Sequence, residues 1–393
     1  MEHLKPSFTK TFNKSEIDTR MFFAPGRVNL IGEHIDYNGG HVLPCALHIG
    51  TYAVVCERED DQINLYSNNF PEKGMVSFSL NNLQFNAEHD WANYPKGVMK
   101  YFYDKGVLNS GLDILFEGNI PNGAGLSSSA SIELLTAVLI NEIFEGTESM
   151  TDLVKISQKV ENEFIGVNCG IMDQFAVGMG KDQHAILLHC DTLNYQYLPL
   201  DLKDSSIVIA NTNKKRGLAD SAYNERRSTC DAALTKIKEK IADVHTLADL
   251  TLEQFELTKD YLTEVEQKRV LHVVSENMRT KQAANLLKEG KLSEFGHLMK
   301  QSHDSLRDLY EVTGNELDTL VEAAWKHKGT IGARMTGAGF GGCTVNIVKN
   351  DEIEDFIEEV GKEYNSKVGY LPSFYIATIG DGAKELKESE VIQ

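Results

Sequence analysis

A run of ten mostly small residues at positions 121–130 constrains this chain most, because of what stands on either side of it. The run reads Pro-Asn-Gly-Ala-Gly-Leu-Ser-Ser-Ser-Ala. Apolar residues alternate before it, at 112–117, as in a strand, and recur at helical spacing after it begins, at 128–143. Glycines let backbone N–H groups approach an anion closely, and a helix N-terminus favours phosphate. The order of strand, glycine loop and helix therefore predicts a phosphate-binding loop rather than a plain serine N-cap.

The other elements indicate an α+β chain of two domains. Short β-type runs fill the first quarter, and a helix is expected from about 150 to 166. Beyond residue 190 we expect a strand at 206–211, helices between 220 and about 328, a glycine-rich turn at 329–342, a strand at 343–348, a helix at 352–365 and a last strand at 374–379. We place the boundary near residue 190, which gives domains 1–190 and 191–393. A cleft between two such domains is a common place for a ligand site.

The charge balance limits the classes of molecule that this protein can bind. Lys plus Arg number 39 and Asp plus Glu 58, for a formal net charge of −19. Such a surface repels nucleic acid and anionic membranes, so an anionic substrate needs a locally positive site. The run Lys214–Arg216 and the pair Arg226–Arg227 are candidates, and solvated faces are an equally good interpretation. The six cysteines form no CxxC pair, and no leader peptide is visible, so we expect a cytoplasmic protein with reduced thiols.

A second segment gathers polar groups suited to a sugar. Residues 26–37 read Gly-Arg-Val-Asn-Leu-Ile-Gly-Glu-His-Ile-Asp-Tyr. Carboxylates and an imidazole can accept hydrogen bonds from the hydroxyls of a free sugar. A metal site at Glu33, His34 and Asp36 is disfavoured, because this segment contains only one histidine and no second cluster completes a coordination sphere.

These segments resemble a known family. The 121–130 loop resembles the ATP loop of the GHMP small-molecule kinases, and 26–37 resembles the signature of the galactokinase branch. Residues 170–175, 221–227 and 332–343 resemble further motifs of the family in the expected order, so the resemblance covers about 20–380. It implies a two-domain GHMP kinase fold and an enzyme that moves the γ-phosphate of ATP onto the anomeric hydroxyl of galactose, with Mg²⁺ as cofactor.

The resemblance also implies a role for each matching residue. Asp173 matches the catalytic aspartate, and Arg27 matches the arginine beside it. Glu161 would by itself be read as a surface carboxylate, and Tyr223 as a half-buried core aromatic. The implied sugar contacts are Glu33, His34, Ile35, Asp36, Asp173 and Tyr223. The implied ATP contacts are Ser67, Gly123, Ala124, Gly125, Leu126, Ser127, Ser128 and Ser129, with Trp91 near the adenine side. The implied Mg²⁺ ligands are Ser129 and Glu161.

The implied chemistry has one open question. The attacking hydroxyl loses its proton as the new bond forms, and Asp173 can accept that proton. Arg27 would stabilise the developing negative charge, but it would also stabilise the ionised carboxylate and so weaken the base. The sequence does not show which effect wins.

Two other functions stay open on the sequence. An N-acetylgalactosamine kinase would need room at the sugar C2 position, and no single residue decides that. A sensor that binds galactose and ATP without turnover would carry a damaged Ser-Ser-Ser-Ala loop. Residues 127–131 are intact here, and Arg27 and Asp173 are both present, so we expect an enzyme. We expect it to be monomeric, with galactose and ATP as its partners.

Overall fold

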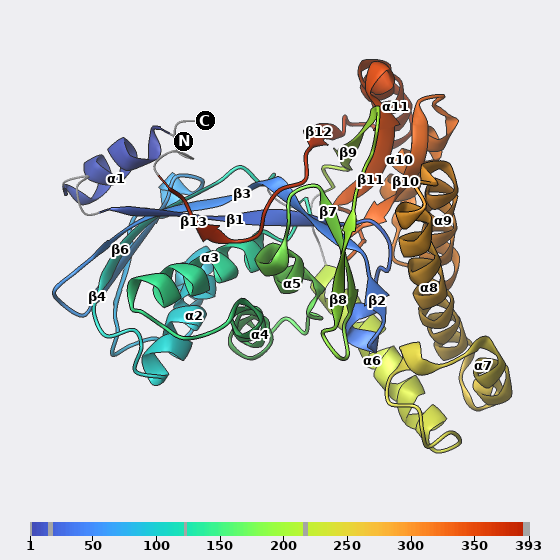
Figure 1. Ribbon diagram of the computed structural model, residues 1–393, viewed down its shortest axis with the longest axis horizontal. Helices are drawn as coiled ribbons and strands as arrows, with labels where there is room; N and C mark the ends of the chain where they lie inside the picture. Colours follow the sequence, from blue (N-terminus) through green and yellow to red (C-terminus); the bar gives the residue numbers. More distant parts are fainter. Residues whose placement is uncertain (1, 15–18, 122–123, 215–218, 388–393) are drawn as a thin grey trace.

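The computed structural model describes residues 2–14, 19–121, 124–214 and 219–387 (Figure 1). Within these ranges no helix combines the length and the apolar character that crossing a bilayer requires. None of the six cysteines, which all lie within these ranges, is paired in a disulfide, as expected for reduced thiols.

The first sheet carries the start of the chain. Its strand order is β13-β1-β3-β6-β4-β5, antiparallel at each contact except the parallel β4–β6 pair. The strands are β1 (Arg20–Asn29), β3 (Pro44–Glu57), β4 (Gln62–Ser67), β5 (Val76–Ser79), β6 (Leu112–Gly118) and β13 (Lys384–Glu385). β13 brings the end of the chain back to β1, so the sheet joins both ends of the sequence.

Helices cover both faces of this sheet. Figure 1 shows, below it, α2 (Asn93–Asp104), α3 (Ser128–Ile143), α4 (Met150–Lys159) and α5 (Met172–Met179). α1 (Leu4–Phe12) packs on the other face. The period of two along β3 explains this sandwich, because Ala53 and Val55 join the core under α3 while Val54 joins Leu4 and Phe8.

A small sheet follows the helices. It pairs β2 (His41–Val42), β7 (His184–His189) and β8 (Tyr195–Pro199) in the order β2-β7-β8. Residue 190 therefore falls in the connection of the β7–β8 hairpin. The boundary near residue 190 stays a prediction.

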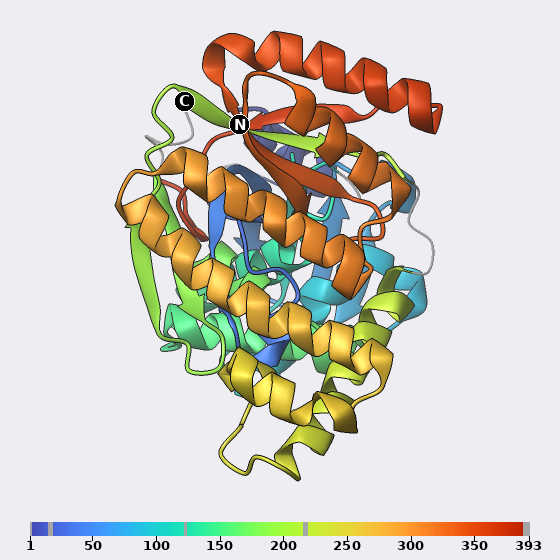
Figure 2. The ribbon, with the colours of Figure 1, turned by 90° about the vertical axis from the view of Figure 1, so that its right-hand side faces the viewer.

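The second large sheet has the order β10-β11-β9-β12, antiparallel throughout. Its strands are β9 (Ser205–Asn211), β10 (Thr330–Thr336), β11 (Cys343–Lys349) and β12 (Ser373–Ala377). The helices of this half of the chain are α6 (Ala219–Lys238), α7 (Leu252–Thr258), α8 (Glu264–Lys288), α9 (Leu292–Ser305), α10 (Gly314–Lys326) and α11 (Ile353–Val368). α10 and α11 pack on one face and α9, backed by α8, on the other, which Figure 2 shows from the side of α8.

Short helical segments connect these elements. The 3₁₀ turns are Asp36–Asn38, Pro71–Lys73, Ala87–Ala92, Leu247–Asp249, Lys259–Tyr261 and Asn350–Glu352. Two π-helical segments, Val160–Ile165 and Leu306–Tyr310, extend α4 and α9. π-helical turns appear frequently at functional sites, and both of these lie beside the cavity described below.

Several predicted elements are confirmed by the structure. The strand at 112–117 and the helix at 128–143 stand on either side of the small-residue run, and the strands at 206–211 and 343–348 pair with one another. The glycine-rich turn predicted at 329–342 was wrong over its first half, because 330–336 is strand β10. α1 was missed; it is short, and packing of Leu4 and Phe8 on the sheet holds it.

We expect Gly296→Ala to destabilise the protein. Alanine in a helix interior normally gains ~1 kcal/mol over glycine. At this position in α9, however, an added methyl would overlap the backbone oxygen of Ile331 in β10, and such overpacking costs ~1–3 kcal/mol or more. Urea unfolding should therefore show a lower midpoint for this variant. Gln301→Ala, at an exposed position of the same helix, should stay within ~0.5 kcal/mol of the wild type. A midpoint above the wild type for Gly296→Ala would contradict the close α9–β10 contact.

Candidate active site

One cavity brings the sequence motifs together. It is lined by residues from 27–36, 125–129, 161–173 and 337–338, with Tyr94 and Tyr223. These segments come from β1 and the loop after it, the start of α3, the π-helical end of α4, the start of α5, α6, and the loop after β10. Segments about 300 positions apart in the sequence therefore meet at one place.

Arg27 and Asp173 form the centre of the cavity. Arg27 lies in β1 after a register shift against β3, and its side chain is 4% exposed. Its Nε and Nη2 donate to Asp173 Oδ1 and Oδ2 at 2.8 and 2.7 Å, a bidentate pair. Its Nη1 donates to the backbone oxygen of Gly125 at 2.8 Å. One guanidinium thus fixes both the aspartate and the glycine loop.

The glycine loop leaves the start of α3 open to an anion. Ser127 precedes the helix in the left-handed conformation, with φ of 63°, and its side chain caps no backbone N–H. Its hydroxyl donates instead to Asp173 Oδ2 at 2.5 Å. The first N–H groups of α3 are therefore free of a side-chain cap and can serve a phosphate. Ala124 is buried beneath the loop. The predicted ATP contact Gly123 lies outside the described residues.

A second glycine-rich loop packs on the first. A methyl added to Gly337 would lie 3.0 Å from the Gly125 backbone oxygen, and one on Gly342 would lie 3.5 Å from that of Ala124. Both glycines have positive φ, of 85° and 79°. The segment 332–343 therefore lies directly against the phosphate loop.

Hard oxygen ligands lie next to the start of α3. Ser129 and Glu161 are in hydrogen-bonding contact, and both line the cavity. Burial first, and the Asp173 charge second, raise the pKa of Glu161 to about 7, so a nearby cation would be favourable. A hydroxyl and a carboxylate suit Mg²⁺, which takes its other ligands from phosphates and water. The described residues contain no group of three His, Cys, Asp or Glu side chains that could hold a metal without such help.

A buried carboxyl stands behind Glu161. Glu133, on α3, is fully buried and lies against Glu161 and Gln174. Gln174 Nε2 donates to Glu161 Oε2 at 2.6 Å. Burial, and then the charge of Glu161, raise the pKa of Glu133 well above its ordinary value, which favours its neutral form. Sequence reasoning missed it; the available signal is an acidic residue between two apolar ones, Ile132 and Leu134.

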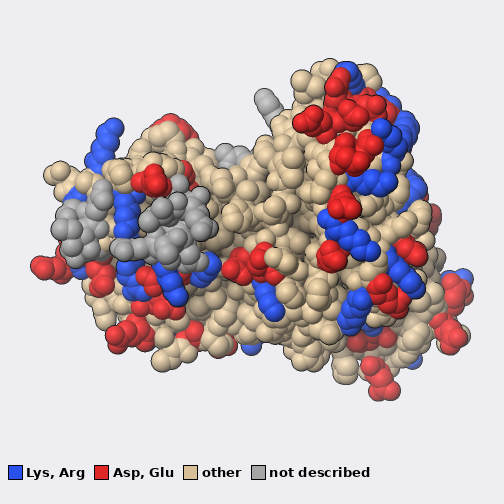
Figure 3. All heavy atoms as spheres, turned by 45° about the horizontal axis from the view of Figure 1, so that its top comes forward, with Lys and Arg blue, Asp and Glu red and all other residues tan. Residues whose placement is uncertain are grey.

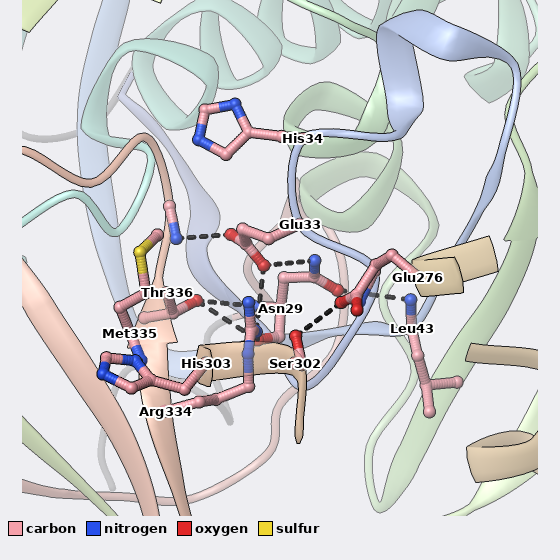
Figure 4. A network of polar contacts seen from close by, with 12 residues as sticks. Asn29, Glu33, His34, Leu43, Glu276, Ser302, His303, Arg334, Met335 and Thr336 are labelled. Atoms are coloured by element: carbon pink, nitrogen blue, oxygen red, sulfur yellow. Dashed lines mark hydrogen bonds and ion pairs between the residues drawn. The ribbon is translucent and has the colours of Figure 1, made fainter. Parts of the chain in front are cut away.

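Asp36 and Glu33 both line the cavity, but the protein holds their carboxylates in different ways. Burial first, and Asp173 second, raise the pKa of Asp36 to about 6. Its carboxylate lies directly against Gly170, where any side chain would overlap it. Glu33 Oε2 accepts from Asn29 Nδ2 at 2.5 Å and from Arg334 Nη1 at 3.0 Å, and its Oε1 accepts from the N–H of Gly337 (Figure 4). Glu33 thus holds two segments together as well as lining the cavity.

Aromatic rings pack around His34 at the same part of the cavity. His34 packs against the rings of Tyr223 and Tyr310 at centroid distances of 5.5 and 5.0 Å. Its Nε2 lies 3.1 Å from the Ala338 backbone oxygen and its Nδ1 2.9 Å from the Tyr37 hydroxyl. Burial lowers the pKa of His34 to about 3. Ile35 differs from its neighbours in the motif, because its side chain lies in the hydrophobic core and not among the described residues that line the cavity.

A smaller, more apolar cavity adjoins the first. Tyr94, Ser128 and Ser129 line both, which makes the two spaces neighbours at the start of α3. Ser67 and Trp91 line the smaller one, together with Phe70, Phe116, Ile120 and Ile132. An apolar space beside a phosphate loop has the character that a flat base requires.

Arg334 and Gly170 are further residues whose importance sequence reasoning missed. Arg334 is completely buried, and its Nη1 also donates to the backbone oxygen of Asn29 at 3.0 Å. A basic residue inside a buried strand beside a glycine loop was the available signal. Gly170 had none, since an isolated glycine between two helices is usually part of a turn.

Comparisons with known proteins agree with the sequence resemblance. Three family profiles match: "Galactokinase galactose-binding signature" over 6–57, "GHMP kinases N terminal domain" over 93–181 and "GHMP kinases C terminal" over 283–366. The galactokinase of Fusobacterium nucleatum is 58% identical over 389 residues, 98% of this chain and 100% of that protein. The galactokinase of Bacillus subtilis is 54% identical, over 98% of this chain and 99% of that protein.

Solved structures give the same result at the level of the fold. The crystal structure of Lactococcus lactis galactokinase complexed with galactose has a TM-score of 0.95 at 45% identity, over 98% of this chain and 99% of that one. A mevalonate kinase of Methanococcus jannaschii shares the fold, with a TM-score of 0.65 at 20% identity.

His34 should stay neutral, with its proton on Nε2, from pH 8 to pH 5. The Ala338 oxygen can only accept, so Nε2 must donate and Nδ1 must accept from Tyr37. Because the folded pKa lies below the unfolded value of ~6.5, protonation favours the unfolded chain, and this histidine lowers stability as the pH falls below ~6.5. Nitrogen-15 spectra of the imidazoles would measure this, with His34→Gln to assign the signal. Titration of that signal between pH 6 and 7 would contradict the geometry.

Proposed function

Because the chain belongs to the galactokinases of the GHMP kinase family, we propose that its Arg27–Asp173 pair is the centre of phosphoryl transfer to galactose. The chain is an ATP-dependent sugar kinase that transfers the γ-phosphate of ATP to the anomeric hydroxyl of D-galactose, giving α-D-galactose 1-phosphate and ADP. One observation carries the assignment of this pair to phosphoryl transfer. Arg27 and Asp173 form a bidentate pair that is also hydrogen-bonded to Gly125 and Ser127 of the phosphate loop.

Asp173 would accept the proton of the attacking hydroxyl. A carboxylate offers about four lone-pair sites, and Arg27 and Ser127 use three of them. One site on Oδ1 remains, and it defines where the hydroxyl binds. Phosphoryl transfer depends mostly on positioning and charge stabilisation. We therefore assign Asp173 chiefly to orienting the hydroxyl and receiving its proton late.

ATP would bind with its phosphates at the start of α3. The N–H groups there and the hydroxyls of Ser128 and Ser129 would contact them, and the base would enter the cavity beside Ser67 and Trp91. Ser129 and Glu161 would hold Mg²⁺. The ion supplies positive charge to the phosphate oxygens in transfer. Arg27 alone among the described arginines and lysines lines the main cavity, so the ion and the backbone must carry much of that task.

Galactose would occupy the side of the cavity formed by Asp36, Glu33, His34 and Tyr223. Asp36 would accept from hydroxyls at the C3/C4 edge, and Glu33 from a hydroxyl nearer C6. The backbone of Ile35 would support both, since its side chain is in the core. We also propose that the enzyme is a cytoplasmic monomer, which fits its acidic charge and its ATP substrate.

Asp173→Asn should remove turnover while leaving galactose binding largely intact. The amide keeps the shape but cannot take the proton, so kcat should fall by at least ~10²–10⁴-fold. ADP release and calorimetric galactose binding would measure the two effects. Asp191→Asn, an exposed aspartate, should behave as wild type. A near-normal kcat for Asp173→Asn would remove Asp173 from the mechanism.

Glu161→Gln should raise the Mg²⁺ concentration needed for activity and lower kcat, with little change in galactose affinity. The amide is a weaker ligand for a hard cation than the carboxylate. Mn²⁺ binding in the presence of ADP, followed by electron paramagnetic resonance, would test the site without turnover. Glu163→Gln, exposed on the same π-helical segment, is the matched control. Metal titrations of Glu161→Gln that superimpose on the wild type would show that Glu161 is not a ligand.

The enzyme should phosphorylate galactose efficiently and glucose negligibly. The two sugars differ only in the direction of the C4 hydroxyl, and a half-buried carboxylate left unpaired costs more than the ~1–3 kcal/mol of a neutral group. Discrimination of ~10⁴-fold is therefore attainable. Asp36→Ala should lose galactose affinity while ATP binding survives. Kinetics on galactose, glucose, 2-deoxygalactose and N-acetylgalactosamine would measure this. Comparable kcat/KM for glucose and galactose would overturn the role of Asp36.

A further inference from the structure

One stripe of α6 connects the segments around the sugar side of the cavity. Tyr223, Arg226, Arg227 and Cys230 stand at positions i, i+3, i+4 and i+7, so they share a helix face. Tyr223 packs on His34, and Cys230 lies 3.1 Å from the hydroxyl of Tyr310. The two arginines were candidates for nucleotide binding on the sequence. In the structure their guanidinium groups donate to backbone oxygens instead.

Both arginines bind backbone oxygens at places where helices end. Arg226 Nε and Nη2 donate to the oxygens of Tyr310 and Glu311 at 2.8 Å each, at the end of the π-helical segment. Arg227 Nη1 donates to the oxygens of Asn168 and Cys169 at 2.7 and 3.2 Å. Residues 166–171 connect the π-helical end of α4 to α5 and have no helix or strand of their own. A charged donor shared by two consecutive carbonyls fixes the path of such a segment.

The segment that Arg227 holds sets the position of Asp36. Cys169 is followed by Gly170, which lies in contact with the Asp36 carboxylate and leaves no room for a side chain. The N–H of Met172, two residues further on, also contacts that carboxylate. The guanidinium of Arg227 additionally lies over the ring of Tyr37, next in sequence to Asp36, at 5.8 Å from its centroid. Arg227 therefore touches both segments that meet at Asp36.

We propose that Arg227 is a positioning residue for galactose recognition, acting by fixing residues 168–170 against Asp36 rather than by binding ATP. This inference rests on the proposed role of Asp36 in the sugar site. Movement of the 168–170 segment would displace the sugar acceptor, while the phosphate loop, held by Arg27 through Gly125, would keep its place.

Steady-state kinetics of Arg227→Met and Arg227→Lys test the proposal. The methionine keeps the apolar stem and removes every donor, so the galactose KM should rise at least 10-fold while the ATP KM changes less than 2-fold. The lysine can still donate to one carbonyl and should recover part of the loss. Arg58→Met breaks a comparable arginine contact, with Asp60 and Asp113, and should leave both KM values unchanged.

The outcomes separate the possible roles of Arg227. Unchanged galactose KM in Arg227→Met overturns the proposal, as does a rise of the ATP KM equal to or larger than that of the galactose KM, because displacement of Asp36 alone does not weaken ATP binding. If Arg227→Met does not fold, Arg227→Lys decides by the same ratio of the two KM values. A merely structural role would lower the active fraction and the melting temperature without moving the galactose KM, and it would also overturn the proposal. Failure of the wild type to phosphorylate galactose would instead reject the proposed function itself.

Discussion

The buried contact between Glu33 and Arg334 sets the alignment on which the active site depends. Glu33 follows β1 of the first large sheet, and Arg334 lies in β10 of the second, 301 positions later. Their side chains are 2% and 0% exposed, and removing two charges from water costs several kcal/mol per ion unless other bonds compensate. Asn29 and the N–H of Gly337 supply such bonds. We infer that the pair contributes mainly to register, because a single alignment satisfies it, and that alignment places the second glycine loop on the phosphate loop.

Crowded carboxylates are the second constraint on this site. Burial and mutual repulsion raise the pKa of Asp36 to about 6 and that of Glu161 to about 7, with Asp173 as a cause in both. Charged side chains elsewhere gather toward the two ends of the face in Figure 3, and uncharged residues dominate its middle. In the proposed arrangement, an acidic chain that binds an anionic nucleotide relies on oriented N–H groups and a divalent cation. The same carboxylates that repel ATP would become favourable once one of them binds that cation.

The sequence predicted the elements and motifs better than the contacts between them. The strand–loop–helix unit at 112–143 was predictable because its periodicity is local, and the family resemblance supplied the kinase function. Ile35 could not be separated from its neighbours, because its direction depends on how Gly40 packs beneath it. Glu133 and Arg334 could not be singled out from the sequence, since burial of a charge depends on partners distant in sequence. Arg226 and Arg227 were candidates for a nucleotide site because their own partners are also distant in sequence. Only the tertiary structure shows that these arginines bind backbone oxygens.

The few lone-pair sites that protein donors leave free explain how a cavity lined by carboxylates can distinguish one sugar from another. A free carboxylate accepts hydrogen bonds over a wide range of directions. Glu33 and Asp173 each accept from three protein donors, which leaves about one lone-pair site on one oxygen of each. His34 differs, because the Ala338 oxygen and the Tyr37 hydroxyl engage both of its nitrogens. In the proposed site, Glu33 and Asp173 therefore each offer about one direction before the sugar arrives. A sugar with one hydroxyl inverted would leave one of those directions unpaired, and in a buried site that cost is not recovered from water.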